Sequence, residues 1–345
     1  MATNTAAWIK EKCGPFVVEE APIPEPKDNE IVIRSHAVAI NPVDGYMYKK
    51  GMLIQSWPTV IGCDVAGTVT AIGTSVTRFK PGDRILACSD YTGDRVNRGC
   101  FQLYCAVFEA LAAKVPENVG FAEACVIPLG LCTAAASLFQ KPNLALPYPV
   151  LEPRSTGKVL MVWGGSSSVG SCAIQMAKAA GFEVATTCSG HNFEYCKDLG
   201  ADYVFDHTKE TVVDDVVKAL KGKESAGVFE AIMAADALVK SAEIAHRLEG
   251  KKHLATVLVG PPTSQVVPEG LPEDVTVTYC WGTTIQHDDV GPAVWGEWVT
   301  SALASGALKG KPNAEVVGQG LGAIQEACER IVKGVSAKKL VVELP

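Results

Sequence analysis

The segment from Val159 to Gly181 limits the possible folds more than any other part of the chain. It opens with an uninterrupted apolar run, Val159–Trp163, which is typical of a strand buried on both faces of a parallel sheet. Gly164 and Gly165 permit a tight turn, and small residues then lead into a pattern with one apolar stripe, as in an amphipathic helix. Because the N–H groups and dipole of a helix N-terminus attract anions, the segment predicts the phosphate site of a dinucleotide-binding domain.

The Gly/Ser turn after this strand departs from three well-known motifs. The strict G-x-G-x-x-G spacing of dinucleotide sites is absent, so an ordinary strand–helix turn stays an alternative. A P-loop would end in Gly-Lys-Ser or Gly-Lys-Thr, and no such triplet follows. The nucleophile turn of hydrolases needs G-x-S-x-G, whereas Gly164-Gly165-Ser166-Ser167-Ser168 ends in serine.

The next predicted strand, Glu183–Thr187, decides which dinucleotide is expected. In NAD sites its tip usually carries Asp or Glu, which accepts a hydrogen bond from the 2′-hydroxyl of the ribose. Here the tip carries Ser189, His191 and Asn192 and no acid, so it can donate hydrogen bonds to a 2′-phosphate. The sequence therefore favours NADPH. Since the tip has no Arg or Lys either, solvated turn residues remain the alternative.

Length and composition exclude several classes of protein. With 345 residues, two domains are expected, and a net charge of −7 with dispersed acids and bases argues against nucleic acid as a partner. No uninterrupted apolar run reaches about 18 residues, and the N-terminal pattern is not that of a secretory signal. We therefore expect no membrane partner and a cytoplasmic location. The 12 cysteines are scattered, which favours free thiols.

The chain changes character along its length, as expected of an α/β protein with two domains. Residues 5–120 are rich in β-formers, glycine and proline and predict a compact, mostly β domain. After a proline-rich loop at residues 141–155, apolar strands alternate with amphipathic helices, which predicts a doubly wound parallel sheet. Other predicted elements are strands at Ile31–Val38, Asp64–Ile72, Arg84–Ala87 and Lys339–Leu344, and helices at Trp295–Ser305 and Leu321–Lys333.

This order of domains resembles the medium-chain dehydrogenase/reductase superfamily over essentially the full chain. The strongest local match is Gly62–Arg84, which is similar to the superfamily's G-x-x-x-A-G-x-V-x-x-x-G-x-x-V-x-x-x-x-x-G-D-x signature. Asn41-Pro42-Val43-Asp44 resembles the N-P-x-D segment of its zinc-free quinone and enoyl reductase branch. Within that branch, the chain looks most similar to fungal trans-acting enoyl reductases of polyketide pathways.

The resemblance implies domain bounds and bears on metal binding. A GroES-like, β-rich catalytic domain would comprise residues 1–128 and 285–345, and a Rossmann cofactor domain residues 129–284. Zinc-dependent members carry Gly-His-Glu at the start of the signature, where this chain has Gly62-Cys63-Asp64, and Asn41 lies where a first ligand is expected. Since a tetrahedral zinc needs deprotonated nitrogen or sulfur ligands at fixed spacing, we expect no metal.

Without a metal to polarise a carbonyl, the expected chemistry is reduction of a conjugated C=C bond. NADPH would deliver hydride to the β-carbon of an enoyl thioester, polyketide-like in its acyl chain. The substrate is either a small molecule or an acyl chain tethered to a carrier protein, with a polyketide synthase as partner in the second case. A quinone or 2-alkenal reductase is the first alternative, and a non-catalytic nucleotide-binding protein is the second. Both a monomer and a homodimer remain open.

The resemblance also implies which residues form the site. Those implied to contact the cofactor are Asn41, Pro42, Val43, Asp44, Gly165, Ser166, Ser167, Ser168, Val169, Ser189, Gly190, His191, Asn192, His207, Val259, Gly260, Trp281, Gly282, Thr283, Val335 and Ser336. Those implied to contact the substrate are Leu129, Gly130, Leu131 and Cys132. The catalytic candidates are Thr133, beside the nicotinamide ribose and substrate, and Tyr46 or Lys49 as proton donor, with protonation by solvent as the alternative.

Overall fold

The computed structural model describes residues 3–90, 92–257 and 268–345, and the chain forms two compact units. The first unit comprises Met1–Leu129, Trp295–Ala304 and Gly310–Pro345, and the second comprises Gly130–Val294 and Ser305–Lys309. The sequence interpretation assigned all of 285–345 to the first domain. Residues 285–294 and 305–309 instead lie in the second unit. The chain therefore enters the second unit twice, at Gly130 and again at Ser305.

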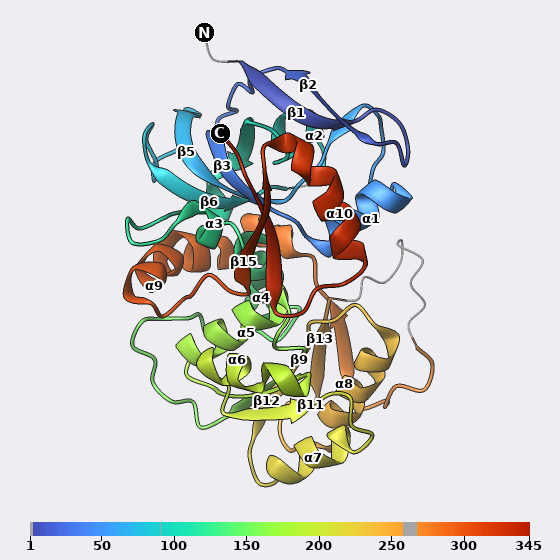
Figure 1. Cartoon of the computed structure of the whole chain (residues 1–345). Coiled ribbons are helices and arrows are strands. Elements are labelled where there is room, and N and C mark those ends of the chain that lie inside the picture. Colours follow the sequence, from blue (N-terminus) through green and yellow to red (C-terminus); the bar gives the residue numbers. More distant parts are fainter. Residues whose placement is uncertain (1–2, 91, 258–267) are drawn as a thin grey trace. The chain divides into compact units, whose positions relative to one another are not determined.

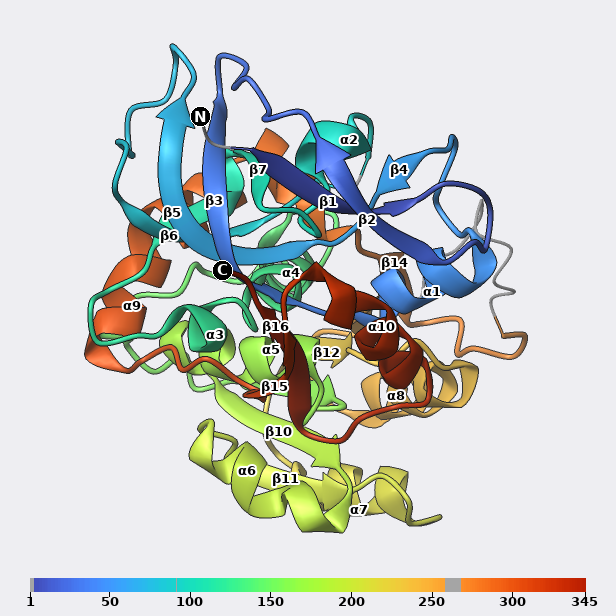
Figure 2. The same cartoon turned by 45° about the horizontal axis from the view of Figure 1, so that its top comes forward.

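The first unit is built around a mixed sheet with the strand order β15-β16-β3-β5-β6-β8. Its centre is β3 (Glu30–Ala39), which pairs antiparallel with β5 (Asp64–Ile72) and with β16 (Lys338–Glu343). The late strand β16 therefore lies inside the sheet, between β3 and β15 (Asn313–Gln319). Figure 2 shows β15 and β16 side by side next to helix α10 (Ile324–Val332).

The remaining strands of this sheet are β6 (Arg84–Cys88), β8 (Ala112–Lys114) and β7 (Tyr104–Phe108), which pairs with β3. A separate three-stranded sheet consists of β1 (Asn4–Ile9), β2 (Phe16–Ala21) and β4 (Thr59–Val60). The helices are α1 (Pro42–Lys50), α2 (Arg95–Arg98), α3 (Phe121–Ala124) and α9 (Val299–Ser305), with short helical turns at Glu109–Leu111 and Leu321–Ala323. The helix predicted at Trp295–Ser305 is in fact a π-helical segment, Pro292–Trp298, followed by α9.

The second unit contains a parallel sheet with the order β11-β10-β9-β12-β13-β14. Sequence order reverses on either side of β9 (Val159–Trp163), because β10 (Glu183–Cys188) pairs on one side and β12 (Ser225–Glu230) on the other. This is the strand order of a Rossmann fold, so the predicted doubly wound sheet is confirmed. The sheet is completed by β11 (Tyr203–Asp206), β13 (His253–Thr256) and β14 (Thr276–Tyr279).

Helices cover both faces of this sheet, as expected of strands that are apolar on both sides. One face packs on α7 (Val212–Ala219) and α8 (Ala235–Arg247), which Figure 1 shows beside the sheet. Apolar residues of both helices form a buried cluster with Val159 and Met161. Helix α5 (Ser168–Ala179) packs on β9 and β10. The remaining helical segments are α4 (Pro128–Phe139), α6 (Phe193–Asp198), Gly190–Asn192 and Gly282–His287.

One apolar segment, Phe121–Phe139, passes a test of length and composition for crossing a membrane. The sequence predicts no membrane-spanning segment here, because Pro128 and Gly130 interrupt the helical pattern. In the structure, 78% of the tested window is buried inside the protein, as in the core helix of a globular fold. The 12 cysteines all lie in the described residues, and none of them forms a disulfide bond.

Candidate functional site

The turn after β9 is closed tightly around two glycines. Gly164 has a φ of 87°, and a Cβ there would lie 2.4 Å from Ile232 Cγ1. Gly170 in the first turn of α5 allows similarly close packing, since its Cβ would lie 2.2 Å from the Gly164 carbonyl oxygen. Ser167 caps α5, with Oγ accepting from Gly170 N at 3.0 Å. The sequence thus brings the N-terminus of α5 directly against the end of β9.

Ser168, the first residue of α5, has a hydroxyl that is buried and has no hydrogen-bond partner among the described residues. A Cβ built on Gly130 would lie 2.8 Å from this Oγ, so a larger residue there would occupy the space beside it. A buried polar group without a partner costs about 1–3 kcal/mol and calls for an explanation. A phosphate oxygen at the helix N-terminus would satisfy it, so these residues fit the pyrophosphate of a dinucleotide.

A buried carboxyl supports this turn from the neighbouring strand. Glu230 ends β12 and has no exposed surface. It accepts hydrogen bonds from Thr256 Oγ1 at 2.5 Å and from the backbone N of Ile232, the residue that contacts Gly164. Burial raises the pKa of the Glu230 carboxyl to about 8. The sequence interpretation missed this residue, although an acid at the end of an apolar strand is the signal that could have found it.

The tip of β10 gathers four of the residues predicted to contact the cofactor. Ser189 Oγ lies 3.2 Å from His207 Nε2, and Asn192 Nδ2 donates to Ser166 Oγ at 3.4 Å. Asn192 is buried, while His191 is exposed. The tip of β10 and the Gly/Ser turn are therefore linked through Asn192, as a continuous dinucleotide site requires.

An acid lies beside this tip that the sequence interpretation did not consider. Asp206 ends β11 and is the register partner of Cys188 at the end of β10. Its Oδ2 would lie 3.4 Å from a Cβ built on Gly190. Thr208 donates to Asp206 Oδ1 from its backbone N at 3.0 Å and its hydroxyl at 2.7 Å, and these bonds lower the pKa of the carboxyl. The tip therefore has a carboxylate neighbour, which comes from the adjacent strand.

Residues near the start of α4 meet a later loop of the second unit. A Cβ built on Gly282 would lie 2.9 Å from both the N and Oγ1 of Thr133, so the structure brings these two predicted site residues together. Thr133 is half-buried, whereas the side chains of Leu131 and Cys132 are fully buried. Thr283 is buried and Trp281 half-buried. Val259 and Gly260 lie outside the described residues.

In the first unit, the N-P-x-D segment forms the start of α1. Asn41 is the N-cap, Pro42 occupies the first turn, and Asp44 Oδ2 accepts from Asn41 N at 2.8 Å. Asp44 is fully buried, and Cys63 Sγ donates to its Oδ1 at 3.5 Å. Burial raises the pKa of Asp44 to about 7 and raises the pKa of the Cys63 thiol. The segment therefore caps the N-terminus of α1 with a capping box.

Two charged residues that the sequence interpretation gave no role complete this cluster, here called the Asn41 network (Asn41, Asp44, Cys63, Asp64 and Lys339). Asn41 Nδ2 donates to Asp64 Oδ2 at 2.9 Å. Lys339 Nζ lies 2.9 Å from the same oxygen and also donates to Asn41 Oδ1. The side chains of Asp64 and Lys339 are 0% and 3% exposed. A lysine inside the apolar strand β16 is the signal that could have found the cluster.

The proton-donor candidates lie in α1, beside other cations and acids. Lys50 Nζ lies 5.0 Å from the centre of the Tyr46 ring, and Tyr46 is half-buried. Lys49 is exposed, with Nζ 3.4 Å from Glu329 Oε1. Val335, half-buried, and Ser336, exposed, follow α10. Lys49 thus has Glu329 as an exposed salt-bridge partner and Tyr46 has Lys50 as a cationic neighbour, and the role of each as proton donor stays a prediction.

A metal site is not apparent in the described parts of the chain, which contain no group of three or more His, Cys, Asp or Glu residues able to hold an ion. Zinc independence remains a prediction.

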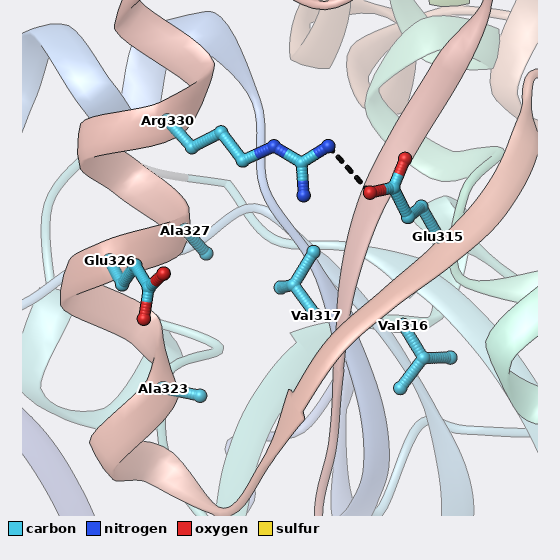
Figure 3. Close-up of a pocket in the computed structure, with 7 residues that line it drawn as sticks. All are labelled: Glu315, Val316, Val317, Ala323, Glu326, Ala327 and Arg330. Atoms are coloured by element: carbon cyan, nitrogen blue, oxygen red, sulfur yellow. Dashed lines mark ion pairs between the residues drawn. The ribbon is translucent and has the colours of Figure 1, made fainter.

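A separate hollow lies between β15 and α10 of the first unit (Figure 3). Glu315 pairs there with Arg330 at 2.5 Å and with Lys338 at 2.9 Å, and Val317 and Ala327 point into the hollow. Its lining includes none of the residues predicted for the site.

Comparison with known proteins agrees with both units. Residues 27–134 match the family model of the alcohol dehydrogenase GroES-like domain, and residues 168–288 match that of the zinc-binding dehydrogenase. Dehydrogenase azaJ of Aspergillus niger is 42% identical over 354 residues, covering 100% of each chain. Trans-enoyl reductase himH of Aspergillus japonicus is 38% identical over 346 residues, covering 99% of this chain and 97% of its own.

Among solved structures, a mycobacterial protein complexed with NADPH, Rv1454c, superposes with a TM-score of 0.72 at 24% identity, covering 99% of this chain and 100% of its own. The GroES-like and zinc-binding dehydrogenase matches, together with full-length relatives that include trans-enoyl reductases, show that the chain belongs to the medium-chain dehydrogenase/reductase superfamily of oxidoreductases.

Proposed function

We propose that this protein is an NADPH-dependent reductase of conjugated C=C bonds in enoyl thioesters. The observation that carries the proposal is the unpaired, buried Ser168 hydroxyl at the N-terminus of α5, in a chain with a trans-enoyl reductase among its full-length relatives. The overall reaction consumes the enoyl thioester, NADPH and one proton, and yields the saturated thioester and NADP⁺.

The second unit supplies the groups that would hold the dinucleotide. When bound, NADPH supplies the hydride that adds to the β-carbon. The N–H groups of the first turn of α5 and the Ser168 hydroxyl would donate to the pyrophosphate. Ser189 and His191 would donate to the 2′-phosphate. The mycobacterial neighbour of the same fold was solved with NADPH, which supports this choice.

NADH is a second candidate cofactor, because Asp206 lies beside the tip of β10. A carboxylate there would accept from a ribose 2′-hydroxyl and repel a 2′-phosphate. The hydrogen bonds from Thr208 occupy Oδ1, whereas Oδ2 is the oxygen closest to Gly190. The affinities for NADPH and NADH therefore have to be measured side by side.

The groups that would act on the acyl substrate are neutral hydrogen-bond donors. The Thr133 hydroxyl, beside Gly282, would orient the ribose and the substrate carbonyl. Negative charge develops on that carbonyl oxygen as hydride adds to the β-carbon, and a fixed donor stabilises it. Tyr46 would then return a proton at the α-carbon. No metal enters the proposal, because the described residues contain no group of three or more His, Cys, Asp or Glu that could hold one.

The substrate assay uses the purified full chain with crotonyl-pantetheine and NADPH or NADH. We expect NADPH oxidation matched by formation of the butyryl product, which mass spectrometry identifies, and no oxidation with butyryl-pantetheine itself. Turnover of quinones or 2-alkenals without turnover of the thioester would replace the proposal by the first alternative. NADPH binding without turnover of any of these compounds would favour a non-catalytic nucleotide-binding protein.

Several finer points stay predictions. A carrier protein of a polyketide synthase as the acyl donor is tested by comparing crotonyl-pantetheine with the same chain on a carrier protein. The choice between monomer and homodimer is tested by sedimentation, and the cytoplasmic location by imaging a tagged chain.

A further inference from the structure

The Asn41 network contains a buried ion pair between Asp64 and Lys339. We propose that Lys339 and Asp64 are positioning residues, which hold the side-chain amide of Asn41 in one orientation for binding the nicotinamide cofactor. The inference rests on the proposed function and on the contact between Asn41 and the nicotinamide cofactor that the family resemblance implies.

The hydrogen bonds assign the two ends of the Asn41 amide. Oδ1 accepts from the Lys339 ammonium, and Nδ2 donates to Asp64 Oδ2 at 2.9 Å. The ammonium lies 2.9 Å from that same carboxylate oxygen, so the three groups form a closed triangle. Asn41 is 3% exposed, Asp64 0% and Lys339 3%, so water competes little with these bonds.

The triangle permits only one orientation of the amide. Turning it by 180° would place Nδ2 against the ammonium, where two donors meet, and Oδ1 against the carboxylate, where two acceptors meet. Both contacts are repulsive and both lie in a buried environment, where electrostatic interactions are strong. The pair therefore fixes which face of the amide donates and which accepts.

The fixed amide keeps capacity for a ligand. Its Nδ2 carries two hydrogens, one of which is used by Asp64, whereas its Oδ1 already accepts from Lys339 and, in the capping box, from the backbone of Asp44. The backbone of Asn41 is held as well, because Asp44 Oδ2 accepts from its N–H at 2.8 Å. A side chain fixed at both ends binds a polar ligand without losing further rotamer freedom.

Asp64 also accepts a hydrogen bond from the backbone of helix α4. Its other oxygen, Oδ1, accepts from Leu129 N at 2.7 Å. Leu129 lies in the first turn of α4, where backbone N–H groups have no partner within the helix. A single carboxylate therefore fixes both Asn41 and the first turn of α4.

A second buried pair in the same unit serves as a control. Arg98 Nη2 lies 2.6 Å from Glu30 Oε1, and these side chains are 12% and 2% exposed. Neither residue bonds to the Asn41 network. A contribution to folding alone would make the two pairs equivalent, whereas a positioning role makes only the Asp64–Lys339 pair matter for the cofactor.

The test is a double-mutant cycle on the full chain. The charge-neutral pair Asp64→Asn/Lys339→Met is made in the natural background and in an Asn41→Ala background, with Lys339→Met alone as a further variant. The dissociation constant for NADPH is measured by fluorescence, and kcat and KM for crotonyl-pantetheine are measured separately. The control is Glu30→Gln/Arg98→Met, and thermal unfolding follows the fold of each variant.

We expect the Asp64/Lys339 pair to weaken NADPH binding and kcat/KM by about 10- to 100-fold in the natural background. In the Asn41→Ala background the loss should fall to about 3-fold or less, because the group on which the pair acts is gone. The control pair should lower the unfolding temperature while changing NADPH affinity and kcat/KM by less than about 3-fold.

The other outcomes overturn the positioning role. Equal losses in both backgrounds, or an equal loss from the control pair, would make the Asp64–Lys339 pair purely structural, and so would failure of every pair variant to fold. If the natural protein binds NADPH but does not reduce the thioester, the proposed function fails and the cycle is decided on NADPH affinity alone. If it binds neither NADPH nor NADH, both proposals fail.

Discussion

The N-terminus of α5 in the second unit and the Asn41 network in the first unit hold polar groups in opposite ways. At α5 the groups are neutral and belong largely to the backbone, and one hydroxyl, that of Ser168, has no partner among the described residues. In the Asn41 network the groups are charged and buried, and Asp64 uses both carboxylate oxygens for bonds within the protein. The first region has a hydrogen-bond donor available for a ligand, whereas most hydrogen bonds of the second region hold the Asn41 amide in place.

The difference separates two uses of buried polarity. A buried donor without a partner lowers the stability of the folded protein, and it forms a favourable hydrogen bond when an anion binds. A buried ion pair is costly to desolvate, so its value lies in the geometry that it enforces. Substitutions in the two regions should therefore change stability and ligand binding in different proportions.

The largest effect on stability is expected from Lys339→Met, because it leaves the Asp64 carboxylate buried without its cation. We expect the free energy of unfolding to fall by about 3–5 kcal/mol, measured by urea denaturation. Lys158→Met is the contrasting variant, since Lys158 pairs with Glu224 while 43% of its side chain is exposed. That change should cost less than about 1 kcal/mol. Equal losses in the two variants would show that the Asp64–Lys339 pair contributes no more to stability than an exposed ion pair.

The next largest effect concerns pH and the Glu230 carboxyl. Its pKa of about 8 in the folded protein lies above the ordinary value of 4.5. The group therefore stabilises the fold fully below about pH 4.5, and this contribution is lost as the pH rises through about 8. Between these pH values the free energy of unfolding should fall by about 2–4 kcal/mol less in Glu230→Gln than in the natural protein. An unchanged pH profile would contradict the raised pKa.

A smaller effect, opposite in sign for stability and binding, is expected from Ser168→Ala. Removing a hydrogen bond to a charged phosphate should weaken NADPH binding by about 10-fold, while stability stays equal or rises by up to about 1 kcal/mol. Ser241→Ala in α8 is the matched control, because Ser241 Oγ is also buried without a partner in the described structure. It should raise stability similarly and leave the dissociation constant for NADPH unchanged. If both variants bind NADPH normally, the phosphate does not contact Ser168.

The smallest effect is a change of cofactor preference in Asp206→Asn. Removing the negative charge beside the β10 tip should improve NADPH binding relative to NADH by about 3- to 10-fold, because repulsion of the 2′-phosphate is relieved. Asp202→Asn is the control, since Asp202 pairs with Lys178 and is not in contact with the tip. Weaker NADH binding without a gain for NADPH would identify Asp206 as the acceptor of the ribose hydroxyl.

The same contrast explains what could be predicted from the sequence. Strands β5 and β9 have the predicted bounds, and the doubly wound order was predictable, because their apolar runs and glycine turns are local signals. Asp206 could not be placed, since only the register of β10 and β11 brings it to the tip. Lys339 was predicted as part of a strand but not as a partner of Asn41, because pairing across distant segments leaves no periodic pattern.

The position of Lys339 in β16 has a consequence for biosynthesis. Lys339 follows Asn41 by 298 residues, and β16 must enter the sheet between β15 and β3. All strands of the second unit's parallel sheet are translated before β16. The nascent chain can therefore complete the parallel sheet of the second unit while the first unit, although begun earlier, still lacks strand β16 and the cation that pairs with Asp64. A chain interrupted before β16 would leave the ribosome with one finished sheet and one exposed to chaperones and proteases.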